Sequence, residues 1–395
     1  MRGSGVCLGF SILAFLPLPG YAQTIAIRAD NVLTISGPPL RNGVVLVKNG
    51  KITAVGPNLP IPAGAAVLRA HTVMPGLIDA HSYLGCYREV SESADSLTPE
   101  LKAADAFDST DLAIVRALRA GVTTAGIMPP NSNVIAGQAA VIRLGPTPTV
   151  LNDSAGLKIS ISPESANSQR NPTSRAGIAE LLQRSIASAR AGRPISGTTQ
   201  TRLLAGGIPT SLSNRNASLA ALAAGKLPAF IHAPGLADAE LALQFMEQLP
   251  AGASLALLHA TDCLDLVPEL KNRSTGVAVV LGPLRFTDNE RVLSQAGKLA
   301  RAGIPVAFCT DAPVSDSASL RMTAHLAVKH GMQRESALRA LTRNAARVLG
   351  IDGRTGSIAA GMDADLLLLD GDPLDLTSRV KTVIAGGKIA HQEGK

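Results

Sequence analysis

Three histidines and one aspartate stand where strongly apolar, strand-like segments end. His81, His232 and His259 each close such a segment, and Asp311 closes the last one. Neutral imidazoles and carboxylates at such ends can meet around one divalent metal ion, most suitably Zn²⁺. That ion lowers the pKa of a bound water to about 7, and a neighbouring carboxylate can then pass the proton to a leaving group. The pattern predicts a metal site that could activate a water molecule.

Each of these residues also has a structural interpretation. A lone histidine near a strand end is more often a hydrogen-bonded structural residue, and an aspartate after an apolar run is often a helix cap or a turn residue. The coincidence favours a site, because three of the seven histidines lie at predicted strand ends and an aspartate closes the last strand. The other four, at positions 71, 325, 330 and 391, are interpreted as surface or helix residues.

The segments that carry these residues alternate with helical patterns. Eight apolar runs are predicted as strands, over residues 73–81, 121–128, 138–144, 156–161, 227–233, 254–260, 276–282 and 305–311. Four of the helical patterns cover residues 175–191, 237–248, 288–302 and 335–349. Continuous apolar strands separated by helices indicate a parallel sheet that is buried on both faces. We therefore predict a closed α/β, (β/α)₈ barrel of the TIM type, whose strand ends converge on one mouth. An open doubly wound sheet is the alternative, but no G-x-G-x-x-G follows the first strand.

The two ends of the chain resemble each other. Residues 44–55 predict a hairpin around Asn49-Gly50, and residues 381–390 predict another around a two-glycine turn. We expect a small composite β-sandwich domain built from residues 24–72 and 356–395, with the barrel over residues 73–355. Two unrelated hairpins are the alternative.

The first 22 residues are typical of a cleaved signal peptide. Arg2 gives a basic start, residues 6–18 are apolar, and small residues precede a cleavage site after Ala22. We therefore expect a secreted or periplasmic protein. No later stretch of 18 or more apolar residues exists, so no stable membrane span is expected in the mature chain.

Composition narrows the functional classes. The chain has 395 residues, 46% hydrophobic and 17% charged, so a large core can form and disorder is not expected. Aromatic residues make up 3% and the net charge of +7 is dispersed, which argues against nucleic acid as a partner. The four cysteines are far apart, without a CxxC, which excludes a cysteine-rich zinc site. The expected partner is a small-molecule substrate, and a homo-oligomer is compatible with the sequence.

Residues 74–81 (MPGLIDAH) resemble the first-strand signature of the amidohydrolase superfamily, especially its imidazolonepropionase-like and prolidase-like members. Segments around His232 and His259, and residues 309–313 (CTDAP), resemble the later ligand strands in the right order. The tail, residues 344–350 and 356–373, is also similar. The resemblance covers nearly the whole mature chain. It implies a metal-dependent hydrolase that acts on amide, cyclic amide or peptide C–N bonds.

The main departure from the family lies in the first strand. The family pattern is His-x-His, but here it is His81-Ser82-Tyr83, so the first metal position loses a ligand and one metal ion is expected. Lys158 resembles the carboxylated bridging lysine of some relatives and is a further candidate ligand. Tyr83 and Gln138 are candidate substrate-binding residues.

Two hypotheses follow from the sequence. The first is an exported, one-metal hydrolase of C–N bonds. The metal is held mainly by His232 and His259, His81 and Lys158 assist, and Asp311 is a further ligand and the general base and acid. The second is a catalytically impaired relative that keeps the fold and binds a small molecule or a partner subunit, motivated by the tyrosine in the His-x-His motif.

Overall fold

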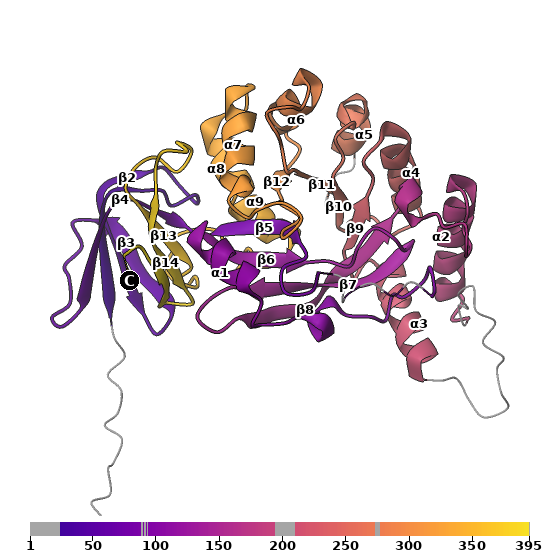
Figure 1. The fold of residues 1–395 in the computed structure, drawn as a ribbon, viewed down its shortest axis with the longest axis horizontal. Coiled ribbons are helices and arrows are strands. Elements are labelled where there is room, and N and C mark those ends of the chain that lie inside the picture. The colour runs from indigo at the N-terminus through magenta and orange to yellow at the C-terminus, as the bar shows by residue number, and fades with distance from the viewer. Residues whose placement is uncertain are drawn as a thin grey trace, which may run out of the picture.

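The computed structural model describes residues 24–87, 90, 92, 94–193, 210–272 and 277–394. Within these ranges the chain forms two β-sheets with helices packed mainly along one of them (Figure 1). The predicted signal peptide, residues 1–22, lies outside the described residues.

The smaller sheet, called the terminal sheet below, joins the two ends of the chain. Its seven strands run in the order β15-β14-β13-β4-β1-β2-β3. The strands are β1 (Ile25–Val32), β2 (Leu40–Lys48), β3 (Lys51–Pro57), β4 (Ala66–Pro75), β13 (Leu366–Leu369), β14 (Val380–Ala385) and β15 (Lys388–Gln392). Figure 1 shows the indigo N-terminal strands beside the yellow C-terminal ones. Strand β13 pairs antiparallel with β4, which makes the sheet one continuous unit.

The terminal sheet curls until its two ends meet. Asn49 and Gly50 turn the β2–β3 hairpin with φ angles of 54° and 77°, as expected for a type I′ turn. The Ala364 N–H donates to Gly50 O at 2.8 Å, and the Gly387 N–H donates to Ala364 O at 2.9 Å. A Cβ atom at Gly387 would lie 2.4 Å from Gly50 Cα, so this approach requires glycine. The curled sheet encloses an apolar layer, but its strands belong to one hydrogen-bonded sheet and not to two separate ones.

The larger sheet forms the predicted barrel. Its eight strands are neighbours in chain order: β5 (Leu77–Ser82), β6 (Val122–Ile127), β7 (Ile135–Arg143), β8 (Thr149–Ser160), β9 (Ala229–His232), β10 (Leu255–Leu258), β11 (Val277–Leu281) and β12 (Val306–Phe308). The segment after β12 returns to β5, because the Tyr83 N–H donates to Ala312 O at 2.7 Å and the Asp311 N–H donates to His81 O at 3.2 Å. These bonds nearly close the barrel at the end that carries the candidate site.

The prediction of eight parallel strands is wrong for β7. This strand pairs antiparallel with both β6 and β8, whereas the other neighbours in the sheet are parallel. The connections on either side of β7 are short, and a parallel crossover needs about a dozen residues or more. The chain therefore turns back directly. Because β7 is antiparallel to both of its neighbours, β8 runs in the same direction as β6. Strands β5, β8, β9, β10 and β12 therefore all run the same way.

The predicted first strand, residues 73–81, is also divided in the structure. Residues up to Pro75 belong to β4 of the terminal sheet, and β5 begins at Leu77. Gly76 lies between them, where a Cβ atom would meet Thr123 Oγ1 at 2.0 Å. The break at this glycine lets one continuous apolar run serve both sheets.

Nine α-helices are found among the described residues. They are α1 (Leu112–Arg119), α2 (Arg175–Arg190), α3 (Thr210–Ala223), α4 (Leu236–Glu247), α5 (Val267–Asn272), α6 (Glu290–Arg301), α7 (Ser319–Lys329), α8 (Arg334–Ala340) and α9 (Arg343–Val348). Ser174 and Asn289 begin α2 and α6 as side-chain N-caps. In the described part of the chain, no helix combines the length and apolar character needed to cross a membrane.

The helix predicted over residues 335–349 is two helices. The chain leaves the helical path between α8 and α9, where Leu341 O accepts a hydrogen bond from the Ile78 N–H at 2.9 Å. This hydrogen bond connects the segment between α8 and α9 to the start of β5, the strand that carries His81.

Candidate metal centre

The barrel gathers the predicted residues from four strands that are distant in sequence. His81 lies in β5, His232 is the last residue of β9, His259 directly follows β10, and Asp311 follows β12 by three residues. These strands run in one direction, so their carboxyl ends share one rim of the sheet. Their side chains can therefore meet although some 230 residues separate the first from the last.

Asp311 is the centre of this cluster. Its Oδ1 atom lies 2.7 Å from His81 Nδ1 and 2.9 Å from His259 Nε2. One ligand atom from each of these three residues lies within 4.8 Å of the other two, which is a spacing that one metal ion can bridge. Among the described residues, no hydrogen bond is made to Asp311 Oδ2, so this oxygen is available for proton exchange.

His232 extends the cluster to a second side. Its Nδ1 atom lies 3.0 Å from His259 Nδ1, and the two rings meet at 67° with centroids 5.0 Å apart. Its Nε2 atom is buried and has no hydrogen-bond partner among the described residues, but lies 3.5 Å from Glu164 Oε1. An imidazole nitrogen that is buried and unsatisfied requires an explanation, and a bound ligand or ion is one.

The electrostatics keep the ligand atoms in the states that a metal needs. Burial lowers the pKa of His81 to about 3 and that of His232 to about 4, so both rings are neutral at pH 7. Burial opposes ionisation of Asp311, but the imidazoles of His259 and His81 hold the pKa of its carboxyl well below the usual range. The cluster therefore presents neutral nitrogen and anionic oxygen donors.

A buried carboxyl group joins the two strands that carry the outer ligands. Asp79 Oδ1 accepts hydrogen bonds from the Thr310 N–H at 3.0 Å and the His81 N–H at 3.4 Å, and the Thr310 hydroxyl donates to Oδ2. Asp311 has a φ of 57°, in the left-handed region, and so does His259 at 56°. Non-glycine residues adopt this conformation at a cost of about 1–3 kcal/mol, which the surrounding structure must impose.

Lys158 lies in β8 with its side chain fully buried beneath the cluster. Its amine is 3.1 Å from His81 Nε2 and donates to Asn131 Oδ1 at 2.7 Å and to Pro129 O at 3.3 Å. Burial lowers the pKa of Lys158 to about 7. The amine thus binds the nitrogen of His81 that faces away from Asp311.

The two predicted substrate-binding residues lie in different places. The Tyr83 ring meets the His81 ring edge-on, with centroids 5.1 Å apart, and burial raises the pKa of its phenol. Gln138, by contrast, is not brought to the cluster. Its amide donates to Pro99 O and to Ser218 Oγ on α3, and its oxygen accepts from Ser154 Oγ on β8, so it connects these segments.

Sequence reasoning missed two residues of the site. Glu164 contacts His232, whose imidazole is the main influence that lowers the pKa of this carboxyl to about 2. Asn131 donates to Glu164 Oε2 at 3.0 Å and accepts from Lys158. Asn131 lies in a loop and Glu164 in a short 3-10 helix after β8, and no motif, periodicity or spacing marks either residue. The Cys263 and Cys309 thiols are both free and buried.

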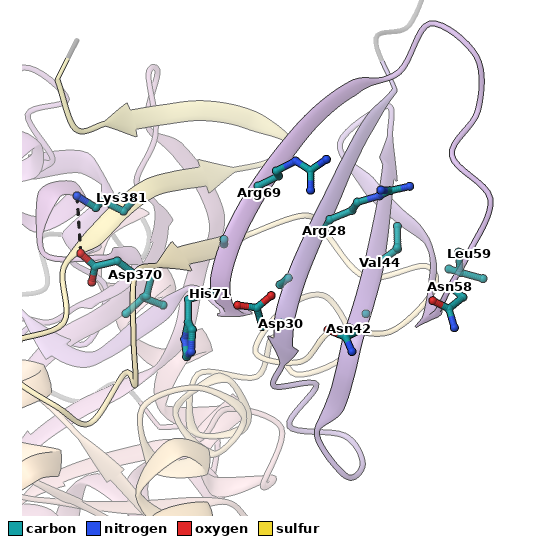
Figure 2. A pocket seen from close by; sticks show the side chains of 14 residues that line it. Arg28, Asp30, Asn42, Val44, Asn58, Leu59, Arg69, His71, Asp370 and Lys381 are labelled. Atoms are coloured by element: carbon teal, nitrogen blue, oxygen red, sulfur yellow. Dashed lines mark ion pairs between the residues drawn. The ribbon is translucent and has the colours of Figure 1, made fainter.

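A hollow of about 750 Å³ on the terminal sheet is not part of this centre. Figure 2 shows its lining, which includes Arg28, Arg69 and His71 and, at one end, the ion pair between Lys381 and Asp370 at 3.7 Å. It contains one histidine and no cluster of metal-ligand atoms, so its size does not make it the chemical site.

The residues at the rim fit a divalent cation. His81, His259 and Asp311 supply two imidazoles and a carboxylate, which is a donor set typical of catalytic zinc sites. His232 lies outside this group of three: its Nδ1 contacts His259 Nδ1, and its unsatisfied Nε2 faces Glu164.

Comparisons with known proteins agree with this geometry. The sequence model of the Amidohydrolase family matches residues 87–391. An imidazolonepropionase of Rhizorhabdus wittichii is 25% identical over 90% of this chain and 94% of its own. A crystal structure of an amidohydrolase from Thermotoga maritima MSB8 covers 93% of this chain and 100% of its own, with 27% identity and a TM-score of 0.81. The structure of A. niger ochratoxinase is 18% identical with a TM-score of 0.57, which shows the fold alone.

The chain belongs to the amidohydrolase family, because the family match spans most of its length. Some curated relatives are matched over only part of their own length. The chain spans 38% of the amidohydrolase TasK of Hapsidospora irregularis, at 24% identity, and 25% of an imidazolonepropionase of Thermoplasma volcanium, at 37% identity.

Proposed function

We propose that this protein is an exported hydrolase that cleaves a C–N bond in an amide, cyclic amide or peptide, with one divalent cation, Zn²⁺, at the rim of the barrel. The observation that carries the proposal is the meeting of His81, His259 and Asp311 around one point. The family match and the relative named imidazolonepropionase support C–N chemistry. Export rests on the N-terminal sequence pattern.

The chain's own residues have distinct tasks in this proposal. His81, His259 and Asp311 hold the cation, with His232 as a further ligand. A divalent cation supplies Lewis acidity, which polarises a carbonyl oxygen and lowers the pKa of water. Asp311 Oδ2 would accept the proton of the attacking water and deliver it to the leaving nitrogen.

A single cation is favoured by two residues. Tyr83 stands where the family pattern has a second histidine, and a buried phenol with a raised pKa is a poor metal ligand. Lys158 binds His81 Nε2, Asn131 and Pro129 through its free amine, so carboxylation would disrupt hydrogen bonds that the fold already makes. In this proposal Lys158 positions His81 instead of bridging two metals.

A screen of dipeptides, hydantoin-like rings and N-acyl amino acids tests the activity. Zinc-loaded protein should hydrolyse at least one of these classes, and Asp311→Asn should abolish the turnover while leaving the fold intact. Turnover that persists in Asp311→Asn would refute the assigned role.

The second candidate function is a relative that binds a small molecule without hydrolysis, and the tyrosine at position 83 is the observation that favours it. This candidate predicts no turnover of any class by the natural chain. It also predicts that Tyr83→His gains both metal and activity.

A further inference from the structure

A second hollow, called the rim cavity below, opens beside the metal centre. Its volume is about 440 Å³, and it is lined by Tyr83, Tyr87, Val90, Asn131, Glu164 and Val314, among others. The lining comes from the segments after β5, β6, β8 and β12, which are the loops at the ligand-bearing rim. A molecule in the rim cavity would therefore lie over the carboxyl ends of the strands.

Two contacts join the rim cavity to the imidazoles. The Tyr83 ring is edge-on to the His81 ring, and Glu164 Oε1 lies 3.5 Å from His232 Nε2. That nitrogen is the buried atom without a hydrogen-bond partner. Two residues that line the rim cavity, Tyr83 and Glu164, therefore contact imidazoles of the candidate centre directly.

The walls are aromatic and apolar. The chain has three tyrosines and no tryptophan, and two of the tyrosines line this one cavity, with ring centroids 6.4 Å apart. Val314 is 59% exposed. Covering its apolar side chain with a bound molecule would be favourable, because it removes apolar surface from water. Tyrosine faces attract cations as well as apolar groups.

Glu164 is the only charged residue among the described residues that line the rim cavity. Its side chain is 59% exposed and so is reachable from the cavity. Asn131 fixes it, because the Asn131 amide donates to Oε2 and leaves Oε1 toward His232. The Asn131 Oδ1 atom accepts a hydrogen bond from the Lys158 amine, so the Asn131 side chain bridges Lys158 and Glu164.

We propose that the rim cavity binds an apolar, positively charged part of the substrate, an amine carried on an aliphatic or aromatic group, and that Glu164 determines this specificity. The proposal rests on the proposed function, since it names the substrate class of the same site. The two tyrosines hold the apolar body and face of the group, and the carboxylate holds its ammonium. Among the described lining residues, no cationic side chain would pair with an acidic substrate group.

Binding can be measured without turnover. The probes are 2-phenylethylammonium and its neutral analogue 2-phenylethanol, titrated by calorimetry into zinc-loaded full-length protein at low salt. We expect the ammonium to bind at least about tenfold more tightly than the alcohol, as for one desolvated charge pair. Glu164→Gln, which keeps the oxygen that accepts from Asn131, should remove this preference and leave alcohol binding unchanged. Glu180→Gln, at a similarly exposed glutamate on α2, should change neither affinity.

Three results would overturn the proposal: equal affinity for the two probes, a preference that persists in Glu164→Gln, or no binding of either probe. Hydrolysis is measured separately, so a failure of the proposed function stays distinguishable. Protein that prefers the ammonium but hydrolyses nothing keeps the cavity assignment and refutes the hydrolase. Protein that hydrolyses only neutral or acidic substrates refutes the cavity assignment and keeps the hydrolase.

Discussion

Asp79 provides a quantitative test of how the metal centre is positioned. Replacing it by alanine removes the acceptor for two buried backbone N–H groups, of Thr310 and His81, and for the Thr310 hydroxyl. Each buried N–H left without a partner costs about 1–3 kcal/mol, so Asp79→Ala should lower the free energy of unfolding by about 2–6 kcal/mol.

The matched control is Asp79→Asn. Burial raises the pKa of Asp79 to about 7, so a neutral amide is a close replacement, and its oxygen still accepts from both backbone N–H groups. We expect Asp79→Asn to cost no more than about 1 kcal/mol, the net value of one hydrogen bond.

Two readouts are needed, because stability alone does not test positioning. Urea denaturation measures the free energy of unfolding, and competition with a chelator measures the affinity for Zn²⁺ under folding conditions. Since Asp79 ties the strand of His81 to the segment of Asp311, the alanine variant should bind Zn²⁺ more weakly by about tenfold to a hundredfold, as for other lost outer-shell partners. The reasoning is refuted if alanine and asparagine give the same losses, or if alanine leaves zinc affinity unchanged.

Two other predictions concern the joint between the sheets and the number of metal ions. Arg143→Met should lower the free energy of unfolding by about 3 kcal/mol in urea, because it leaves the buried Asp365 without its ion pair, whereas the exposed Arg334→Met should cost less than about 1 kcal/mol; equal losses would contradict this. Tyr83→His combined with Lys158→Glu should raise the zinc content from one to about two ions per chain, since it restores the second histidine directly after β5 and replaces the amine with a carboxylate. Elemental analysis measures it, and unchanged content would contradict the positioning role of Lys158.

Much of the fold can be predicted from the sequence, because short segments of the chain specify its turns and buried strands. Asn49-Gly50 specifies a tight turn whatever surrounds it, and continuous apolar runs bounded by helices specify buried strands. The reversal of β7 could also have been anticipated, because the gap after residue 128 is too short for a parallel crossover. Periodicity alone does not report strand direction.

The site was predictable only as far as strand ends mark it. His81, His232, His259 and Asp311 stand at such ends, so a barrel brings them to one rim. Glu164 carries no such mark, because its place depends on the path of a loop after β8. The burial of Lys158 against His81 likewise depends on the packing of non-adjacent strands, β8 against β5, which no sequence window contains.

Zinc content of the purified protein tests the central claim most directly. After expression with added zinc and removal of loosely bound metal, elemental analysis should find about one Zn²⁺ per chain, as a catalytic site of three or four protein ligands holds. His259→Ala should lose most of it, while His330→Ala should keep it, because the His330 imidazole pairs with Glu290 and is not part of the cluster. Wild-type protein with less than about 0.1 metal ion per chain would contradict the account, because a formed site of this kind retains its ion.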